Sequence, residues 1–408
     1  MQRWYLLISL LLLMTVAESA QQSDTVSFSK AREVILNHNF GIKAAQSRIE
    51  AARADVEQAK VYPNPEVSIG LGNLGVGEIE IGAAQKFELG GKRKLRRETA
   101  LSEVRAYENS HKLVEAELEA EIVRRFIPIA VTEKKLALVD SVISNAQTTA
   151  EQITGRIEAG ASRKTDLLRV EIELEQLQLE RSGLERALNQ ARRRFASLGG
   201  NESSRLVNVN GDLNEAQIPA LDSLLNAVAL SPRMKAYELQ IAGLETRKQQ
   251  LRTEAVPDLG ASAAYVRNNK EGANSVGVGF SMGLPLFNHN VDAQRSVEFQ
   301  KKSLLEQQKN QLVNLRTDIS DIHSTLLQID SNINILLTVT IPKAQKVYGL
   351  IREYYNAGNT SFLDLISIQQ ELLQLEMELL DLKAERADAV TELMAITASS
   401  FDIVNTEE

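Results

Sequence analysis

The sequence contains no cysteine in 408 residues. Disulfide bonds, thiolate metal ligands and a lipidated N-terminal cysteine are therefore excluded. Aromatic residues are also scarce, at 5%, which is low for a globular enzyme. Leucine, alanine, glutamate, glutamine, lysine and arginine dominate instead, a composition typical of long helices.

A basic excess is absent as well. Lysine and arginine number 46 against 54 acidic residues, which gives a net charge of −8. The densest cationic run, Arg192-Arg193-Arg194, lies in an otherwise mixed helical stretch and is interpreted as a solvated face. We therefore expect no nucleic-acid partner.

Long apolar runs are missing too, apart from Leu6 to Val16 at the N-terminus, which is too short to span a bilayer. Arg3 precedes this run, and Ala17-Glu18-Ser19 follows it as a small-x-small cleavage site. These features predict a secretory signal peptide over residues 1–19. No later segment predicts a transmembrane helix in the mature protein. The signal peptide predicts that the protein is exported.

One phrase occurs twice, with Ala-Gly, five further residues and then Asp-Leu. The first copy runs from Ala159 to Leu167 and the second from Ala357 to Leu365. Glycine can end a helix in the left-handed conformation, and Ser162 or Ser361 can cap the helix that follows. The phrases predict the bends of two long helical hairpins.

The helical period of the first half is lost in a short middle segment. A helix is predicted from Ser29 to about Lys60, followed by strands over about 66–89 and a helical hairpin over about 92–198. The outgoing helix of this hairpin has about 65 residues, or about 100 Å. Pro128 predicts a kink in it.

The second half repeats this plan. A helix is predicted from Leu221 to Glu254, strands over about 258–287 and a hairpin over about 291–398, interrupted at Pro342. The chain thus divides into a first repeat over residues 20–200, a linker over 201–220, a second repeat over 221–398 and a C-terminal tail over 399–408. This arrangement indicates an internal duplication.

The predicted strands alternate apolar residues with glycine or serine. Val67, Ile69 and Leu71 are separated by Ser68 and Gly70, and the other strands follow the same rule. Aromatic residues fall near the expected strand ends, at Tyr62, Phe87, Tyr265 and Phe287. This pattern is typical of outer-membrane strands that face lipid on one side and a lumen on the other.

The alternative is a soluble four-stranded sheet packed on helices. Four strands leave two open edges, which hydrocarbon forbids and which promote aggregation in water. Strands pooled from several copies remove the edges, and three copies would supply twelve. The membrane sheet is therefore the favoured interpretation. The fold class is mainly α with a small β part.

These features resemble the TolC-like outer-membrane factors over essentially the whole mature chain. Two motifs, Tyr62-Pro63-Asn64-Pro65-Glu66 and Phe87-Glu88-Leu89-Gly90-Gly91-Lys92-Arg93, resemble more specifically the CzcC/CusC branch, which serves heavy-metal efflux pumps. The resemblance implies a homotrimer with a twelve-stranded barrel in the outer membrane and a helical tube through the periplasm. It also implies a membrane-fusion adaptor and a resistance-nodulation-division pump as partners.

The resemblance also gives the bends a role as the periplasmic gate. Asp166 and Asp364 match the aspartate that constricts the tube, and Tyr355 matches the tyrosine that links neighbouring helices. The remaining matches at the bends are Thr165, Thr360, Gly160 and Gly358. Six carboxylates around one axis would favour cations.

A purely local role for these aspartates is the alternative, because acidic residues are favoured in the first turn of a helix. Some family members carry a second acidic residue three positions on, where this chain has Arg169 and Ser367. That second acidic ring is therefore missing or replaced in this chain.

Neither catalysis nor a dedicated metal site is expected. Four histidines share no ligand spacing, and the GxGxxG spelled by residues 70–75 is followed by a strand rather than a helix. No nucleophile-base arrangement stands out, and no cofactor is expected. Two classes stay open: a passive conduit, for metal, multidrug or type I protein export, and a periplasmic coiled-coil scaffold without a pore.

Overall fold

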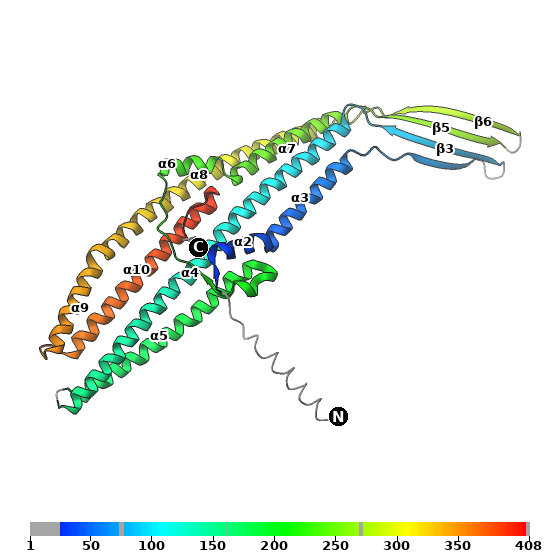
Figure 1. The fold of residues 1–408 in the computed structure, drawn as a ribbon. Helices are drawn as coiled ribbons and strands as arrows, with labels where there is room; N and C mark the ends of the chain where they lie inside the picture. Colours follow the sequence, from blue (N-terminus) through cyan, green and yellow to red (C-terminus); the bar gives the residue numbers. More distant parts are fainter. Residues whose placement is uncertain (1–24, 73–76, 161, 269–271, 405–408) are drawn as a thin grey trace, which may run out of the picture.

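The computed structural model describes residues 25–72, 77–160, 162–268 and 272–404. The expected signal peptide, and parts of both strand turns, lie outside these residues. The described chain is elongated, with a small sheet at one end, two helical bends at the other and a short-stranded region between them (Figure 1).

A single helix runs most of the length of the molecule. Helix α4, Lys92–Glu158, has 67 residues, and α5, Lys164–Ala196, returns beside it. Helix α4 continues through Pro128, where the sequence predicts a kink. The length matches the expected hairpin because Leu, Ala, Glu, Lys and Arg all favour helix.

The second hairpin contains an irregular turn. Helix α8, Val291–Ile335, passes through a π-helical segment, Leu336–Thr340, into α9, Ile341–Asn356. Pro342 lies in the first turn of α9. Proline has no backbone N–H, so one helical hydrogen bond is missing at this position. The interruption predicted at Pro342 is therefore confirmed. Helix α10, Phe362–Thr397, completes the hairpin.

The helix predicted from Ser29 to Lys60 is two helices. Helix α2, Phe28–His38, ends at Asn39, and α3, Phe40–Ala59, begins there. Asn39 is extended, at φ −61° and ψ 131°. Its side-chain oxygen accepts hydrogen bonds from Gly41 N and Ile42 N, while its amide donates to Leu198 O at 2.9 Å. One asparagine thus caps a helix and anchors it to the end of the first hairpin.

A second predicted helix also divides. Helix α6, Leu221–Ala229, is separated from α7, Pro232–Glu254, by a break at Ser231. The Ser231 hydroxyl accepts a hydrogen bond from Met234 N, and Pro232 occupies the first turn. A serine followed by proline is a favourable helix start, so the preceding helix ends there.

Four strands form the sheet. They are β2, Glu66–Gly72; β3, Glu78–Phe87; β5, Leu259–Asn268; and β6, Ala273–Met282, and they pair antiparallel in the order β2-β3-β5-β6. The helices that continue them contact one another in the matching order α3, α4, α7, α8. The two repeats therefore lie side by side as one row of four (Figure 1).

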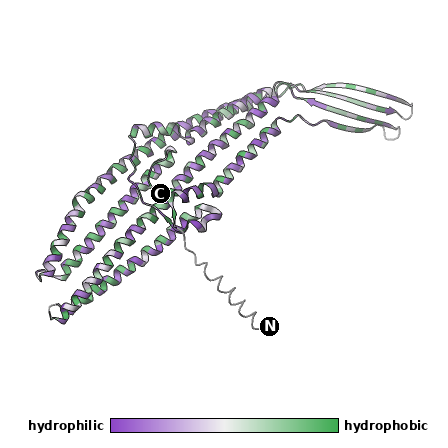
Figure 2. Cartoon of the chain, viewed as in Figure 1, coloured by the Kyte–Doolittle hydropathy of each residue, from purple (hydrophilic) through white to green (hydrophobic). Residues whose placement is uncertain are grey.

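The register sorts the sheet into an apolar and a polar face. Ile81 lies opposite Ile69 and Tyr265, and Tyr265 lies opposite Val276, so these side chains share one face. The strands accordingly alternate in hydropathy (Figure 2). The large exposed apolar residues of this face are Val67, Ile69, Leu71, Ile79, Ile81, Phe87, Tyr265, Val276, Val278, Phe280 and Met282. Tyr265 lies within β5, not at its end as expected.

The main core lies in the middle of the molecule. Phe28, Phe126 and Phe195 pack together there, with ring centroids 4.7 and 6.1 Å apart. Two short strands, β1, Val26–Ser27, and β4, Val209–Asn210, pair in parallel beside them. The segment expected to be a tail joins this core.

Ile403→Ala is expected to lower the free energy of unfolding by about 2–5 kcal/mol, because its buried side chain would leave a cavity. Ile403 is buried, and its carbonyl accepts a hydrogen bond from Asn214 N at 2.7 Å. Asp402→Ala, at an exposed neighbour, is the matched control. Thermal unfolding followed by circular dichroism measures both, and equal melting temperatures would contradict the prediction.

Candidate functional site

The two bends lie at the same end of the molecule, opposite the sheet (Figure 1). Gly160 and Gly358 adopt φ of 72° and 77°, the left-handed conformation that side chains disfavour. Each glycine follows the last helical turn and reverses the chain. Both glycines therefore have the conformation that the repeated phrase predicts.

Asp364 makes the denser set of contacts at the bends. Its Oδ2 accepts hydrogen bonds from Ser361 Oγ at 2.6 Å, Thr360 Oγ1 at 2.8 Å and Ser361 N at 3.2 Å. Ser361 Oγ in turn accepts from Asp364 N, so the pair forms a capping box and confirms Ser361 as the cap. The hydroxyl hydrogen bonds from Ser361 and Thr360 lower the pKa of Asp364, because they stabilise its ionised form.

Asp166 is held more loosely. Helix α5 begins after Arg163, not after Ser162, so the prediction of Ser162 as a cap is wrong. An arginine side chain accepts no hydrogen bond, and Asp166 compensates by accepting from Arg163 N at 3.4 Å. Thr165 is exposed beside it. The local capping role expected of the aspartates is thus present at both bends.

Tyr355 lies between the two hairpins. Its side chain is 9% exposed and packs with Ile153, Val170, Phe362 and Leu365, which come from α4, α5 and α10. The Tyr355 and Phe362 ring centroids are 5.6 Å apart. Among the described residues, its buried hydroxyl has no hydrogen-bond partner. Within one chain, then, the ring connects the hairpins.

Arg156 joins the bends through the backbone. It lies in the last turn of α4 and donates from Nη2 to Asn356 O at 3.0 Å and from Nη1 to Tyr355 O at 3.5 Å. Its guanidinium carbon lies 5.2 Å from the centroid of the Tyr355 ring. Carbonyls at a helix C-terminus lack helical partners and favour a positive charge. Arg156 of the first hairpin thus caps the second.

Sequence reasoning missed Arg156. The structure brings Arg156, Tyr355 and Phe362 together across the two bends. It places Asp166 and Asp364 in separate caps. The second repeat has Tyr354 at the position equivalent to Arg156, so the signal was a difference between the copies of the repeat. A search for shared residues does not find a contact made by only one copy.

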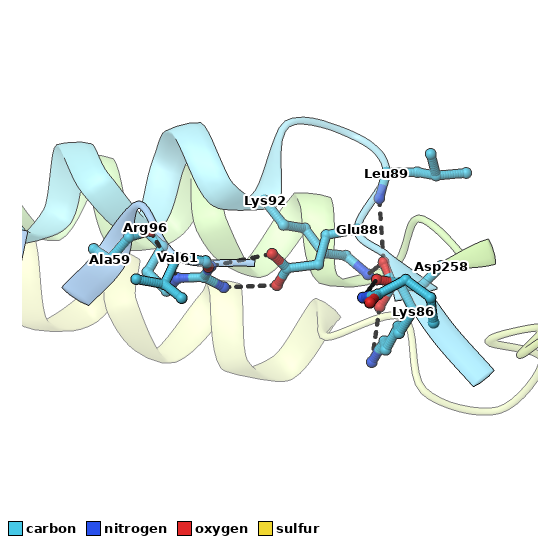
Figure 3. A network of polar contacts seen from close by, with 9 residues as sticks. Ala59, Val61, Lys86, Glu88, Leu89, Lys92, Arg96 and Asp258 are labelled. Atoms are coloured by element: carbon cyan, nitrogen blue, oxygen red, sulfur yellow. Dashed lines mark hydrogen bonds and ion pairs between the residues drawn. The ribbon is translucent and has the colours of Figure 1, made fainter. Parts of the chain in front are cut away.

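A second polar cluster lies where the sheet meets the helices (Figure 3). Asp258 precedes β5, and its side chain is 16% exposed. It accepts hydrogen bonds from Lys92 Nζ at 2.7 Å and Leu89 N at 3.3 Å and pairs with Lys86 at 3.0 Å. Burial alone would raise the pKa of Asp258, but the bonds from Lys92, Lys86 and the Leu89 amide outweigh it and lower the pKa.

Arg96 forms the other half of this junction. It makes a paired contact with Glu88, at 2.6 and 3.1 Å, and donates to Ala59 O and Val61 O at the end of α3. Three of the connections between sheet and helices, α3 to β2, β3 to α4 and α7 to β5, are therefore joined by the motif from Phe87 to Arg93 and its neighbours. This motif has a structural task in the described chain.

Gly90→Ala is expected to be more destabilising than Gly91→Ala. Both glycines have positive φ, at 70° and 79°, so alanine is strained at either by about 1–2 kcal/mol. A Cβ on Gly90 would also meet Val256 Cβ at 2.9 Å, whereas one on Gly91 meets nothing within 4 Å. Gly91→Ala is thus the matched control, and thermal unfolding of both variants measures the difference. Equal destabilisation would contradict close packing against Val256.

None of the described helices is both long and apolar enough to cross a membrane. No group of three His, Asp or Glu side chains in the described ranges has the geometry to hold a metal ion.

The fold is that of known outer-membrane channels with a helical tunnel. The outer-membrane channel OprN superposes with a TM-score of 0.74 at 18% identity, over 91% of this chain and 90% of that one. The structure of CusC superposes with a TM-score of 0.71 at 16% identity, over 90% and 91%. The TolC-like fold class is therefore confirmed.

A family model described as outer membrane efflux protein matches residues 31–201 and again residues 224–399. The chain belongs to this family, whose members are channels of the outer membrane that extend into the periplasm. The cobalt-zinc-cadmium resistance protein CzcC of Cupriavidus metallidurans is 21% identical over 364 residues, 87% of this chain and 85% of that protein. The resemblance to the CzcC/CusC branch is confirmed.

Proposed function

We propose that three copies of the chain form the outer-membrane conduit of a tripartite efflux system that exports heavy-metal cations. The main observation in favour of a conduit is the sheet at the end of the long helices, which has one apolar and one polar face. Among the described residues, β2 and β6 each pair on one side only. An edge of this kind needs a partner in hydrocarbon, and a neighbouring copy supplies it.

Threefold closure extends the row of elements seen in one chain. Strands β2 and β6 lie at the ends of the sheet, and α3 and α8 lie at the ends of the matching row of helices. Three such rows would give a twelve-stranded barrel that continues into a tube of twelve helices. The apolar face would contact lipid and the glycine-rich polar face would line the lumen.

Charge on the polar face supports cation passage. The register places Glu66, Glu78 and Glu80 on this face, with Lys86 as the basic residue of the same strands. In a trimer these carboxylates recur around the axis and give the lumen a negative potential. Identification of the cargo as metal depends on the similarity to a cobalt-zinc-cadmium resistance protein.

The bends are proposed as the periplasmic gate. The caps of Asp166 and Asp364 and the packing of Tyr355 set where the hairpins end. A membrane-fusion adaptor and a resistance-nodulation-division pump would engage this end and supply the driving force. The conduit itself is passive.

The first test is location and assembly. We expect a detergent-requiring, heat-modifiable trimer in the outer-membrane fraction that conducts ions in a planar bilayer. A soluble periplasmic protein without conductance would replace the conduit with the coiled-coil scaffold.

The second test is growth of a deletion strain and its complemented parent on graded zinc, cadmium, cobalt, copper and silver and on hydrophobic drugs. We expect sensitivity confined to one or two metals. Sensitivity to drugs alone would assign the same conduit to multidrug efflux, and failure to secrete a protein would assign it to type I secretion.

A further inference from the structure

The start of α4 carries more positive charge than the junction uses. Residues 92–97 read Lys-Arg-Lys-Leu-Arg-Arg. Lys92 is bound by Asp258 and Arg96 by Glu88, so these two cations are neutralised. Arg93, Lys94 and Arg97 have no such role. Within the described part of the chain, Arg93 and Arg97 lie within 4 Å of no carboxylate, and the side chain of Lys94 is 80% exposed, 3.9 Å from Glu98.

These three cations border one hollow of about 610 Å³. Lys60, at the end of α3, and Tyr62 complete its basic and aromatic lining. Glu88 also lines the hollow, but both of its carboxylate oxygens are engaged by Arg96. Lys60 is paired with Glu57 at 2.5 Å, so the positive charge of the hollow comes mainly from Arg93, Lys94 and Arg97.

Tyr62 gives the hollow a fixed edge. The Arg93 guanidinium carbon lies 4.0 Å from the centroid of the Tyr62 ring, and 58% of Tyr62 is exposed. Stacking holds the guanidinium plane while its N–H groups stay available, a geometry suited to a phosphate. The N-cap residue of helix α4, Gly91, provides no side-chain cap and itself lines the hollow.

The position of the hollow selects the source of the anion. The hollow lies next to the end of the apolar sheet face. Phe87, which is 44% exposed, is the last residue of β3, and α4 begins five residues later at Lys92. Phe287, at the corresponding end of the second repeat, is 99% exposed. In an outer-membrane protein whose helices extend into the periplasm, this level is the headgroup layer of the inner, periplasmic-side leaflet. Basic side chains at that depth attract anionic lipids.

We propose that Arg93, Lys94 and Arg97, with Lys60 and Tyr62, bind the phosphate of an anionic phospholipid in that leaflet. One such lipid per chain would lie with its acyl chains along the apolar sheet face. This site depends on the outer-membrane location and not on the identity of the exported substrate.

The test uses purified full-length protein in a neutral detergent, titrated with phosphatidylglycerol or phosphatidylcholine and followed by native mass spectrometry. We expect phosphatidylglycerol to bind at least about tenfold more tightly, and Arg93→Gln with Arg97→Gln to lose about tenfold in affinity, or about 1.4 kcal/mol. Lys43→Gln with Arg48→Gln, which removes two exposed cations of α3, is the matched control and should leave binding unchanged.

Lys94→Gln is a second variant for the case in which the double substitution prevents folding. It changes only a highly exposed side chain and should weaken phosphatidylglycerol binding several-fold. Equal affinity for the two lipids, or equal binding by all variants, would overturn the site. Full competition by millimolar inorganic phosphate would show a free-anion site instead of a lipid site. The growth test on metals is a separate experiment. If it shows that the exported substrate is not a metal, the result of the lipid-binding test is unaffected.

Discussion

Replacing both Asp166 and Asp364 with alanine is expected to raise the single-channel conductance of the protein in a planar bilayer. Each carboxylate accepts a hydrogen bond from the backbone N–H of the N-cap residue of its return helix, Arg163 or Ser361. Loss of such a cap costs about 1 kcal/mol per helix, and a trimer would lose six. The hairpin ends should then fray and widen the gate proposed at the bends.

Substitution of the two aspartates by asparagine tests their negative charge separately from their capping hydrogen bonds. Its side-chain oxygen can still accept the same hydrogen bonds, while the negative charge is removed. We expect Asp166→Asn with Asp364→Asn to keep the low conductance but to weaken block by multivalent cations by about tenfold or more. The alanine pair should lose both the low conductance and the cation block.

The pH dependence follows from Asp364. Its pKa is lowered from the ordinary 3.8 by the hydrogen bonds from Ser361 and Thr360. The capping contribution of the ionised group is therefore fully present above that ordinary value and is lost as the pH falls through the lowered one. Between about pH 5 and 8, the difference between Asp364→Asn and the natural chain should stay constant.

Glu158→Gln with Glu353→Gln is the matched control, because both carboxylates are exposed beside the bends and accept no hydrogen bond within the described chain. It removes the same charge without touching a cap. If the control and the aspartate variants alter conductance and cation block alike, the aspartates have no specific place in the gate.

Periodic features of this protein could be predicted from its sequence. The alternation in β3 and the helical spacing after it change at the motif around Gly90 and Gly91, so the start of α4 at Lys92 was predictable. The left-handed glycines at the bends followed from the repeated phrase. Both signals are local, since they depend on residues within one or two turns.

Contacts between distant segments were not predictable in this way. Asn39 breaks a helix because Leu198, far along the chain, accepts its side-chain amide. Ile403 is buried because the chain end pairs near Leu213. Arg156 finds its carbonyl partners only when the two hairpins meet. In each case the decisive partner belongs to another element.

The contacts of the motif from Phe87 to Arg93 give it a structural role that the sequence did not indicate. Its likeness to a metal-efflux branch favoured metal, yet Glu88, Gly90 and Lys92 are each used to fasten sheet to helices. In the part of the chain that the structure describes, the contacts of this motif therefore join the sheet to the helices.

Arg156→Gln is expected to open the resting bends, raise conductance and lower the first thermal transition. The substitution removes two charge-assisted hydrogen bonds between the hairpins and the contact with the Tyr355 ring. At this half-exposed site, the loss of these contacts should lower the free energy of unfolding by about 1–2 kcal/mol. Arg169→Gln is the control, because Arg169 is exposed on the same bend and makes no contact of this kind in the described structure.

Two substitutions at Tyr355 test its ring and its hydroxyl group separately. The hydroxyl has no partner in the described chain, so Tyr355→Phe should keep the natural conductance, whereas Tyr355→Ala should behave like Arg156→Gln because it removes the packing against Phe362. If Tyr355→Phe also opens the channel, the hydroxyl must be bonded by a neighbouring copy, and the gate would lie between chains. If Arg156→Gln leaves conductance unchanged, the bends are held by packing alone.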